Sequence, residues 1–176
     1  MKVGKNIGLF LLLAVLAACE PDKTCRQDVD VAAEIVLKGT VIDTAGTATA
    51  FTSWDSITVQ GVGNDSVLYN NAKSVSKLLV PLKIDTNVTA YSLTWHGQTD
   101  VVYFRHDNTR RFVSMACGCV IYHSIEEVWC NGVWIDSVKI VNNAVEAVEQ
   151  ENVQVYVTIV EEPSTEEEEN GEESEE

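Results

Sequence analysis

The chain has 176 residues and a formal net charge of −15. This length suits one domain with short terminal segments. Residues 161–176 contain ten of the 27 acidic residues and no basic one, so the rest of the chain is only mildly acidic. Because no basic stripe is present to neutralise phosphates, nucleic acid is excluded as an expected partner.

The first segment combines a basic start, an apolar run and a small-residue end. Lys2 and Lys5 precede the apolar residues 7–15, and Leu16-Ala17-Ala18-Cys19 follows. This order is typical of a secretory signal, and the run is shorter than the roughly 20 residues of a membrane-spanning helix. The last four residues resemble a bacterial lipobox. That resemblance implies cleavage before Cys19 and acylation of its thiol and new amine, as with palmitate; a cleaved signal without lipid is the alternative.

The remaining chain divides into three parts. Residues 1–18 are the expected signal peptide, and residues 19–31 form a polar, lipidated tether that spans ~30–40 Å if extended and leaves the domain free to reorient. Residues 32–160 are the expected folded domain. Residues 161–176 are rich in Glu and cannot bury a core, which predicts a disordered tail. No segment after the signal is apolar for long enough to span a membrane.

Short alternating segments indicate strands along the domain. Branched and apolar residues favour strands at 31–42, 56–60, 67–69, 75–82, 88–95, 101–105, 111–115 and 119–123. In residues 88–95, Thr89, Tyr91, Leu93 and Trp95 form the expected core face. Asp107-Asn108 is a predicted turn.

The last part of the domain contains the strongest hairpin pattern. Asn131-Gly132 lies between the apolar segments 128–130 and 133–135. A short helical turn is expected at residues 144–149, and residues 153–160 alternate again. About ten short strands separated by turns predict an all-β fold. An antiparallel β-sandwich, immunoglobulin-like or similar, is the first choice and a small barrel the second.

The cysteines predict an oxidised domain. If Cys19 is lipidated, four remain, at Cys25, Cys117, Cys119 and Cys130. An even number in an exported chain favours two disulfides, with three pairings open. A bridge between the neighbours Cys117 and Cys119 is strained on a strand. The preferred arrangement joins Cys25 to one of these two and Cys130 to the other.

The same cysteines, together with His96, His106 and His123, form an alternative metal-ligand set. Their spacing shows no paired ligand motif, so we expect neither a metal nor a cofactor. His96 and His106 adjoin Gly97 and Asp107 and are predicted turn residues. His123 is the histidine nearest to Cys119 along the chain.

Enzymatic motifs are missing from the sequence. There is no G-x-S-x-G sequence, Gly61-Val62-Gly63 lacks the lysine of a phosphate loop, and Glu126 and Glu127 point to opposite faces if they lie on a strand. We therefore predict no catalytic residue and no enzymatic activity.

Trp129 and Trp134 flank the predicted hairpin turn and are candidate binding aromatics. They face each other across the two strands in this interpretation. Cross-strand packing is the alternative role for the pair.

Four triplets have the form Asp-Ser/Thr-apolar. They begin at Asp43, Asp55, Asp65 and Asp136 and resemble the O-glycosylation sites of exported proteins in the Bacteroides group. The candidate acceptors are Thr44, Ser56, Ser66 and Ser137. Ordinary turn chemistry, in which Asp accepts hydrogen bonds at the end of a loop, explains the triplets equally well.

Several stretches together resemble a known family. They are the lipobox, Cys25, residues 55–66 (DSITVQGVGNDS), residues 80–82 (VPL), residues 112–118 (FVSMACG) and residues 135–138 (IDSV). The chain resembles small lipoproteins of unknown function from Bacteroides-type bacteria over most of residues 19–160. This resemblance implies an envelope lipoprotein without implying an activity, a catalytic residue or a ligand.

The expected function is that of a lipid-anchored protein of the cell envelope, most readily the outer membrane, with the periplasmic or surface face undecided. Its partners are the membrane, through the lipid, and an envelope protein or glycan. A metal-handling module and an envelope hydrolase are the alternatives.

Overall fold

The computed structural model describes residues 25, 29–64 and 66–161, and these form eleven strands and no helix. The strands are β1 (Ala33–Ile42), β2 (Ala48–Phe51), β3 (Ile57–Gly61), β4 (Val67–Ala72), β5 (Lys77–Val80), β6 (Val88–Trp95), β7 (Gln98–Ser114), β8 (Gly118–Cys130), β9 (Ser137–Ile140), β10 (Ala144–Val145) and β11 (Glu151–Val160). The all-β prediction is confirmed. The signal peptide, Cys19 and almost the whole predicted tail lie outside the described residues.

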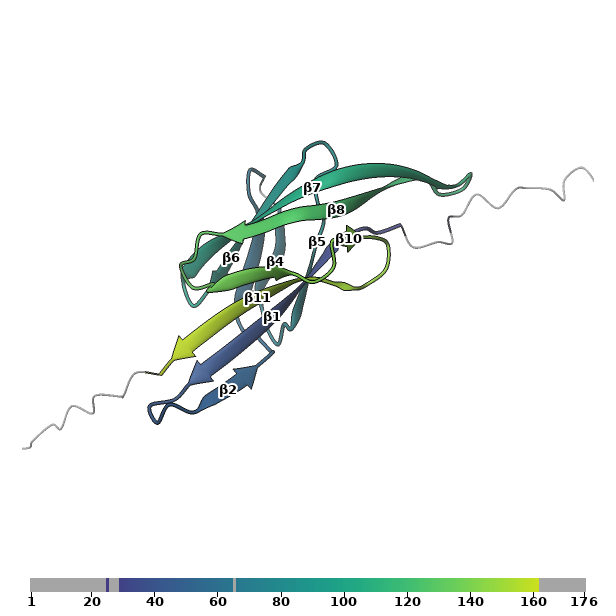
Figure 1. The fold of residues 1–176 in the computed structure, drawn as a ribbon. Helices are drawn as coiled ribbons and strands as arrows, with labels where there is room; N and C mark the ends of the chain where they lie inside the picture. The colour runs from purple at the N-terminus through teal and green to yellow at the C-terminus, as the bar shows by residue number, and fades with distance from the viewer. Residues whose placement is uncertain (1–24, 26–28, 65, 162–176) are drawn as a thin grey trace, which may run out of the picture.

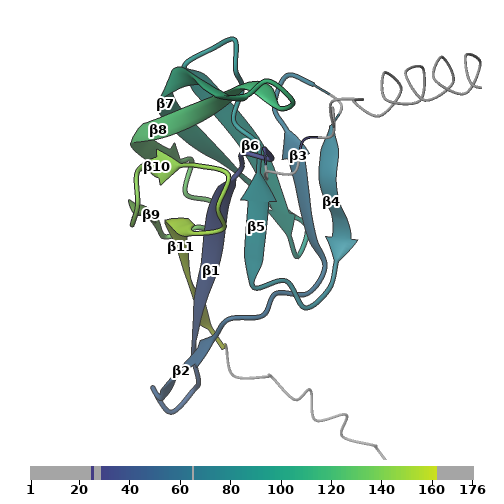
Figure 2. The same ribbon diagram turned by 90° about the vertical axis from the view of Figure 1, so that its right-hand side faces the viewer.

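Two sheets enclose the core (Figures 1 and 2). The larger is antiparallel, has the order β10-β8-β7-β6-β3-β4 and curls into a half-barrel. The smaller has the order β2-β1-β11-β9, and β5 also pairs with β1. The fold is therefore a two-layered β structure whose larger sheet wraps partly around the smaller one.

The first and last strands of the domain pair in parallel, which the expected antiparallel sandwich does not include. Ile35 of β1 lies opposite Val153 of β11, and the register continues to Ile42 opposite Val160. An alternating apolar pattern specifies which face of a strand is buried but not the direction of its neighbour. The pattern therefore predicted both strands without their relative orientation.

Alternating side chains build the core as the sequence predicts. In β11, Val153, Val155 and Val157 are buried, and in β6, Thr89, Tyr91 and Leu93 are buried. These faces meet the inward residues of β1 and β7, which are Ile35, Leu37, Val102 and Phe104. Each fully buried Leu, Ile or Phe side chain contributes ~1.5–3 kcal/mol through removal from water.

Three local predictions are wrong. The predicted turn at Asp107-Asn108 lies within β7, which continues for 17 residues. Residues 144–149 contain the short strand β10 rather than a helical turn. The Asn131-Gly132 hairpin does not form, because residues 131–136 cross from the larger sheet to the smaller one, where β9 pairs with β11.

The ends of the described domain lie on opposite sides of the molecule. In Figure 1 the start of the described chain lies on the side of the β7–β8 turn, and β11 ends on the other side. Among the described residues, no helix is long and apolar enough to cross a membrane.

Candidate functional site

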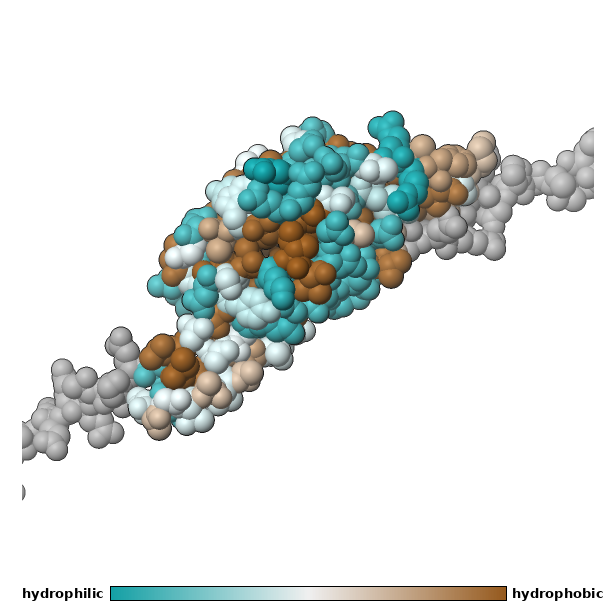
Figure 3. Space-filling model, in the orientation of Figure 1, coloured by the Kyte–Doolittle hydropathy of each residue, from teal (hydrophilic) through white to brown (hydrophobic). Residues whose placement is uncertain are grey.

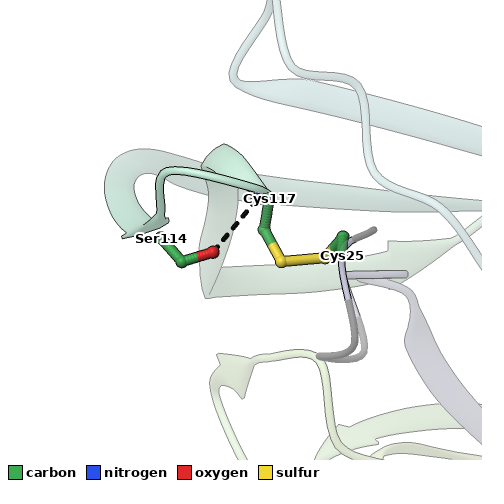
Figure 4. Close-up of a disulfide and its surroundings, with 3 residues drawn as sticks. All are labelled: Cys25, Ser114 and Cys117. Atoms are coloured by element: carbon green, nitrogen blue, oxygen red, sulfur yellow. Dashed lines mark hydrogen bonds between the residues drawn. A yellow bond between two sulfur atoms is a disulfide. The ribbon is translucent and has the colours of Figure 1, made fainter. Parts of the chain in front are cut away.

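A disulfide fixes the start of the domain to the β7–β8 turn. Cys25 is bonded to Cys117, with 4.7 Å between their Cα atoms and a sequence separation of 92. Figure 4 shows the bridge and the adjacent hydrogen bond from the Cys117 backbone N–H to Ser114 Oγ, which is 3.0 Å long. Gly118 has a φ of 73°, a left-handed conformation that suits glycine and lets the chain turn into β8. The predicted pairing of Cys25 with one of Cys117 and Cys119 is confirmed.

The predicted second disulfide is absent, because Cys119 and Cys130 are free thiols. They lie near the two ends of β8, eleven positions apart on one extended strand. At about 3.3 Å per residue, this separation is ~36 Å, far beyond the span of a disulfide. The pKa of the Cys130 thiol is raised by burial and by the nearby Asp100, which favours the unreactive protonated form.

Four polar side chains of β6, β7 and β8 form a hydrogen-bonded chain, and all of them are buried except the half-buried Asn108. We call it the histidine network; its members are Thr89, His106, Asn108 and His123. Thr89 Oγ1 lies 2.9 Å from His106 Nε2, and Asn108 Oδ1 lies 2.9 Å from His106 Nδ1 and 2.7 Å from His123 Nδ1. The side chains of His106 and His123 are 0% and 5% exposed.

The surrounding hydrogen bonds determine which ring nitrogens carry protons. The Asn108 amide group donates to the carbonyl oxygens of Lys83 and Thr86, so its Oδ1 is the acceptor for both histidines. Both imidazoles therefore donate through Nδ1. Thr89 Oγ1 accepts the Lys83 N–H and donates to the free Nε2 of His106. Each neutral ring then has a matching partner at Nδ1.

Burial keeps both histidines neutral at physiological pH. The pKa of His106 is lowered chiefly by burial, although Asn108 and the nearby Asp107 oppose this shift. Burial, and to a smaller extent the neighbouring His106, lower the pKa of His123 to about 4. The prediction of a turn position for His106 is wrong, whereas His96 does lie at a turn, with a φ of 49°.

An apolar groove with a volume of about 390 Å³ lies between the start of the domain and β8. Its walls are mostly branched apolar side chains, together with one thiol, one disulfide sulfur and one imidazole. The lining residues are Val29, Val31, Pro81, Leu82, Ile84, Cys117, Cys119, Val120, Ile121 and His123. Since His123 donates through Nδ1, its Nε2 is the nitrogen that accepts a hydrogen bond.

The candidate metal ligands are spread over the domain. Cys119 and His123 line the same groove, but His96 lies at the β6–β7 turn and Cys130 at the far end of β8. No group of three His, Cys, Asp or Glu side chains within the described residues has the geometry to hold a metal ion.

The two candidate binding tryptophans have different surroundings. Trp134 is 8% exposed and packs in the core against Trp54 and Trp95, at ring-centroid distances of 5.8 and 5.6 Å. Trp129 stacks on Tyr103 of β7 at 5.2 Å, with the Arg105 guanidinium 5.7 Å from its ring. The expected facing pair is therefore wrong, because Trp134 lies in the core within the loop after β8, whereas Trp129 stacks on Tyr103 on β8 itself.

Asp100 explains why the predicted hairpin does not form. Its buried carboxylate accepts the backbone N–H groups of Val133, Trp134 and Ile135 at 2.7–2.9 Å. This contact holds residues 131–136 in a loop that directs Trp134 into the core. Nothing in the sequence around Asp100 indicates the role, since its partners lie more than 30 residues away.

The four candidate glycosylation residues are exposed, in agreement with either interpretation of the triplets. Asp43 accepts the N–H groups of Ala45 and Thr47, and Asp55 accepts that of Ser74. These two aspartates therefore stabilise turns. Modification of Thr44, Ser56, Ser66 and Ser137 stays a prediction.

The paired acids Glu126 and Glu127 are both exposed. Glu127 forms an ion pair of 2.8 Å with Arg105, and Glu126 occupies a bulge where the β7–β8 register shifts. Both are arranged as surface acids on a strand.

The fold and the site define a disulfide-bonded, all-β domain with an apolar groove beside its N-terminal bridge. A family model of unknown function, DUF6452, matches residues 56–157. The match spans more than half of the 176 residues, and the chain belongs to this family. No curated protein and no solved structure matches the chain.

Proposed function

We propose that the protein is a lipid-anchored component of the bacterial cell envelope that binds a partner without catalysing a reaction. The Cys25–Cys117 disulfide carries the proposal, since such bridges persist in oxidising, exported compartments. It lies six residues after Cys19, the acylation site that the lipobox implies. A triacylated cysteine provides a stable membrane anchor.

Two surfaces support a binding role. The apolar groove beside the disulfide is lined by branched apolar side chains and by the imidazole of His123. On the outer face of β7 and β8, Tyr103, Arg105 and Trp129 form a stacked row. Aromatic and arginine side chains of this kind are common in protein and glycan interfaces. An envelope protein or glycan is the partner class that these surfaces suit.

The anchor is tested by growing cells that express the full chain with labelled palmitate. We expect label in the wild-type protein and in the control Cys25→Ala, and none in Cys19→Ala. Unlabelled wild-type protein of full signal-cleaved mass would overturn the proposal.

Metal handling receives less support. Cys119 and His123 share the groove, but a structural zinc site needs four ligands. Titration of the purified mature protein under denaturing, non-reducing conditions tests this alternative, and we expect two free thiols, from Cys119 and Cys130.

A further inference from the structure

The tip of the β7–β8 hairpin exposes large apolar side chains at the anchored end of the domain. Met115 is 94% exposed and Phe112 is 62% exposed. We call these two residues the apolar tip. Brown and tan surface marks this end of the molecule in Figure 3. Because water contact with such side chains is unfavourable, an exposed pair at a hairpin end calls for an explanation.

The disulfide limits how far the apolar tip can move from the acylated cysteine. Cys25 lies only six positions after Cys19, and this stretch of chain spans at most ~22 Å. Cys25 is bonded directly to Cys117, two positions after Met115. The tether to the tip is therefore about half as long as the 12-residue segment that the sequence suggests, and the tip stays near the membrane surface.

The charge around the tip suits a phospholipid surface. Residues 108–125 contain Arg110 and Arg111 and no acidic residue, although the whole chain has a net charge of −15. Both arginines are exposed. The Arg111 guanidinium lies 4.7 Å from the Tyr122 ring centroid and 3.5 Å from Glu146. Basic side chains beside exposed apolar ones are typical of segments that lie in the membrane interface.

We infer that the apolar tip inserts into the interface of the membrane that holds the lipid anchor, so that Phe112 and Met115 contact lipid and the exposed Arg110 contacts phosphate headgroups. This inference rests on the proposed lipid anchor. It fixes the orientation of the domain: β7 and β8 point toward the membrane, and the C-terminal end of β11 points away from it.

Met115 provides a direct probe, because the only other methionine, Met1, lies in the predicted signal peptide. Val160→Met places a second methionine at the far end of β11, where Val160 is 64% exposed. The lipoprotein carrying this substitution is reconstituted into vesicles of phosphatidylethanolamine and phosphatidylglycerol and treated with hydrogen peroxide. Peptide mass spectrometry then measures sulfoxide formation at both positions.

We expect Met115 to oxidise at least about fivefold more slowly than the introduced methionine, since the interface excludes the peroxide solution. A lipid-free control combines Cys19→Ser with a signal that has no lipobox. In buffer without vesicles, the two methionines of this control should oxidise at similar rates. Phe112→Asp should remove the protection of Met115 in vesicles. Val133→Asp, a matched change at a site that is 57% exposed and lies just beyond the far end of β8, should leave the protection intact.

The outcomes separate the inference from the proposed function. A protein whose intact mass includes the acyl chains but whose two methionines oxidise equally in vesicles would overturn the inference and keep the anchor. A protein without acyl mass would instead overturn the anchor. Protection of Met115 in the lipid-free chain would assign the tip to a contact between copies, which also overturns the inference.

Discussion

Asp100 is a buried charged residue that determines the path of the chain between the two sheets. Its carboxylate accepts three backbone N–H groups from residues 133–135. Hydrogen bonds to a charged acceptor each contribute roughly 1.5–3 kcal/mol, and donors left without a partner in the interior cost a similar amount. One side chain therefore outweighs the local preference of Asn131-Gly132 for a hairpin.

Asp100→Ala should lower the free energy of unfolding by roughly 3 kcal/mol or more, because three buried N–H groups lose their acceptor. Denaturant titration followed by tryptophan fluorescence measures the change and also reports the environment of Trp134. Asp136→Ala, an exposed aspartate in the same loop, is the control and should change stability by less than ~0.5 kcal/mol. A small effect at Asp100 would contradict this role.

The histidine network makes stability depend on pH. The pKa of His123 is about 4 in the folded protein and about 6.5 in the unfolded chain. Above pH 6.5 the His123 ring is neutral in both the folded protein and the unfolded chain. As the pH falls from 6.5 to 4, the unfolded chain binds a proton that the folded protein does not, so stability decreases; below pH 4 this loss levels off.

The free energy of unfolding should therefore fall between pH 6.5 and pH 4 by up to ~3 kcal/mol through His123. His123→Gln should reduce this pH dependence, whereas His96→Gln, at an exposed turn, should retain it. Urea titrations at several pH values measure the difference between the variants. Identical pH profiles for the wild type and His123→Gln would contradict the assignment.

At the scale of the elements, the β7–β8 hairpin is the part that the disulfide controls. Its 17-residue first strand passes through Asp107-Asn108 without turning, because His106 and Asn108 point into the buried network. Polar residues that would usually mark a turn are here satisfied inside the fold. The hairpin thus reaches from the core to the bridge at Cys117.

Cys25→Ser/Cys117→Ser should destabilise the protein by up to about 4–5 kcal/mol, since the bridge closes a loop of roughly 90 residues in the unfolded chain. Differential scanning calorimetry of oxidised wild type and the double variant measures this loss. Cys119→Ser, which removes an exposed free thiol, is the control and should leave the transition unchanged. Equal melting temperatures for all three proteins would show that the bridge does not stabilise the fold.

At the scale of the whole molecule, the parallel pair β1 and β11 joins the two ends of the domain. Nine register positions connect them, and the antiparallel strands β2, β5 and β9 complete the sheet around the pair. The strand that pairs with β1 therefore ends at Val160, and residues 161–176 contain no aliphatic or aromatic side chain.

Deletion of residues 162–176 should leave the melting temperature within about 1 °C of the wild type, because the deleted segment has nothing to bury in the core. Thermal unfolding followed by circular dichroism measures the melting temperature of both proteins. A matched deletion that also removes residues 153–161 should unfold the protein, since it removes the buried face of β11. A large loss on removing the tail alone would contradict the prediction of a disordered segment.

The all-β class, most strand positions and the buried faces of β6 and β11 could be predicted from the sequence, because they follow from alternation and from the chemistry of neighbouring residues, both of which are local. The even number of cysteines favoured a bridge from Cys25 to Cys117 or Cys119 but left three pairings open. Tertiary packing sets the choice of Cys117, the parallel pairing of β1 and β11, the burial of His106, the loop held by Asp100 and the separation of Trp129 from Trp134. Each depends on partners distant in sequence, and no local pattern encodes which distant group satisfies a buried donor or acceptor.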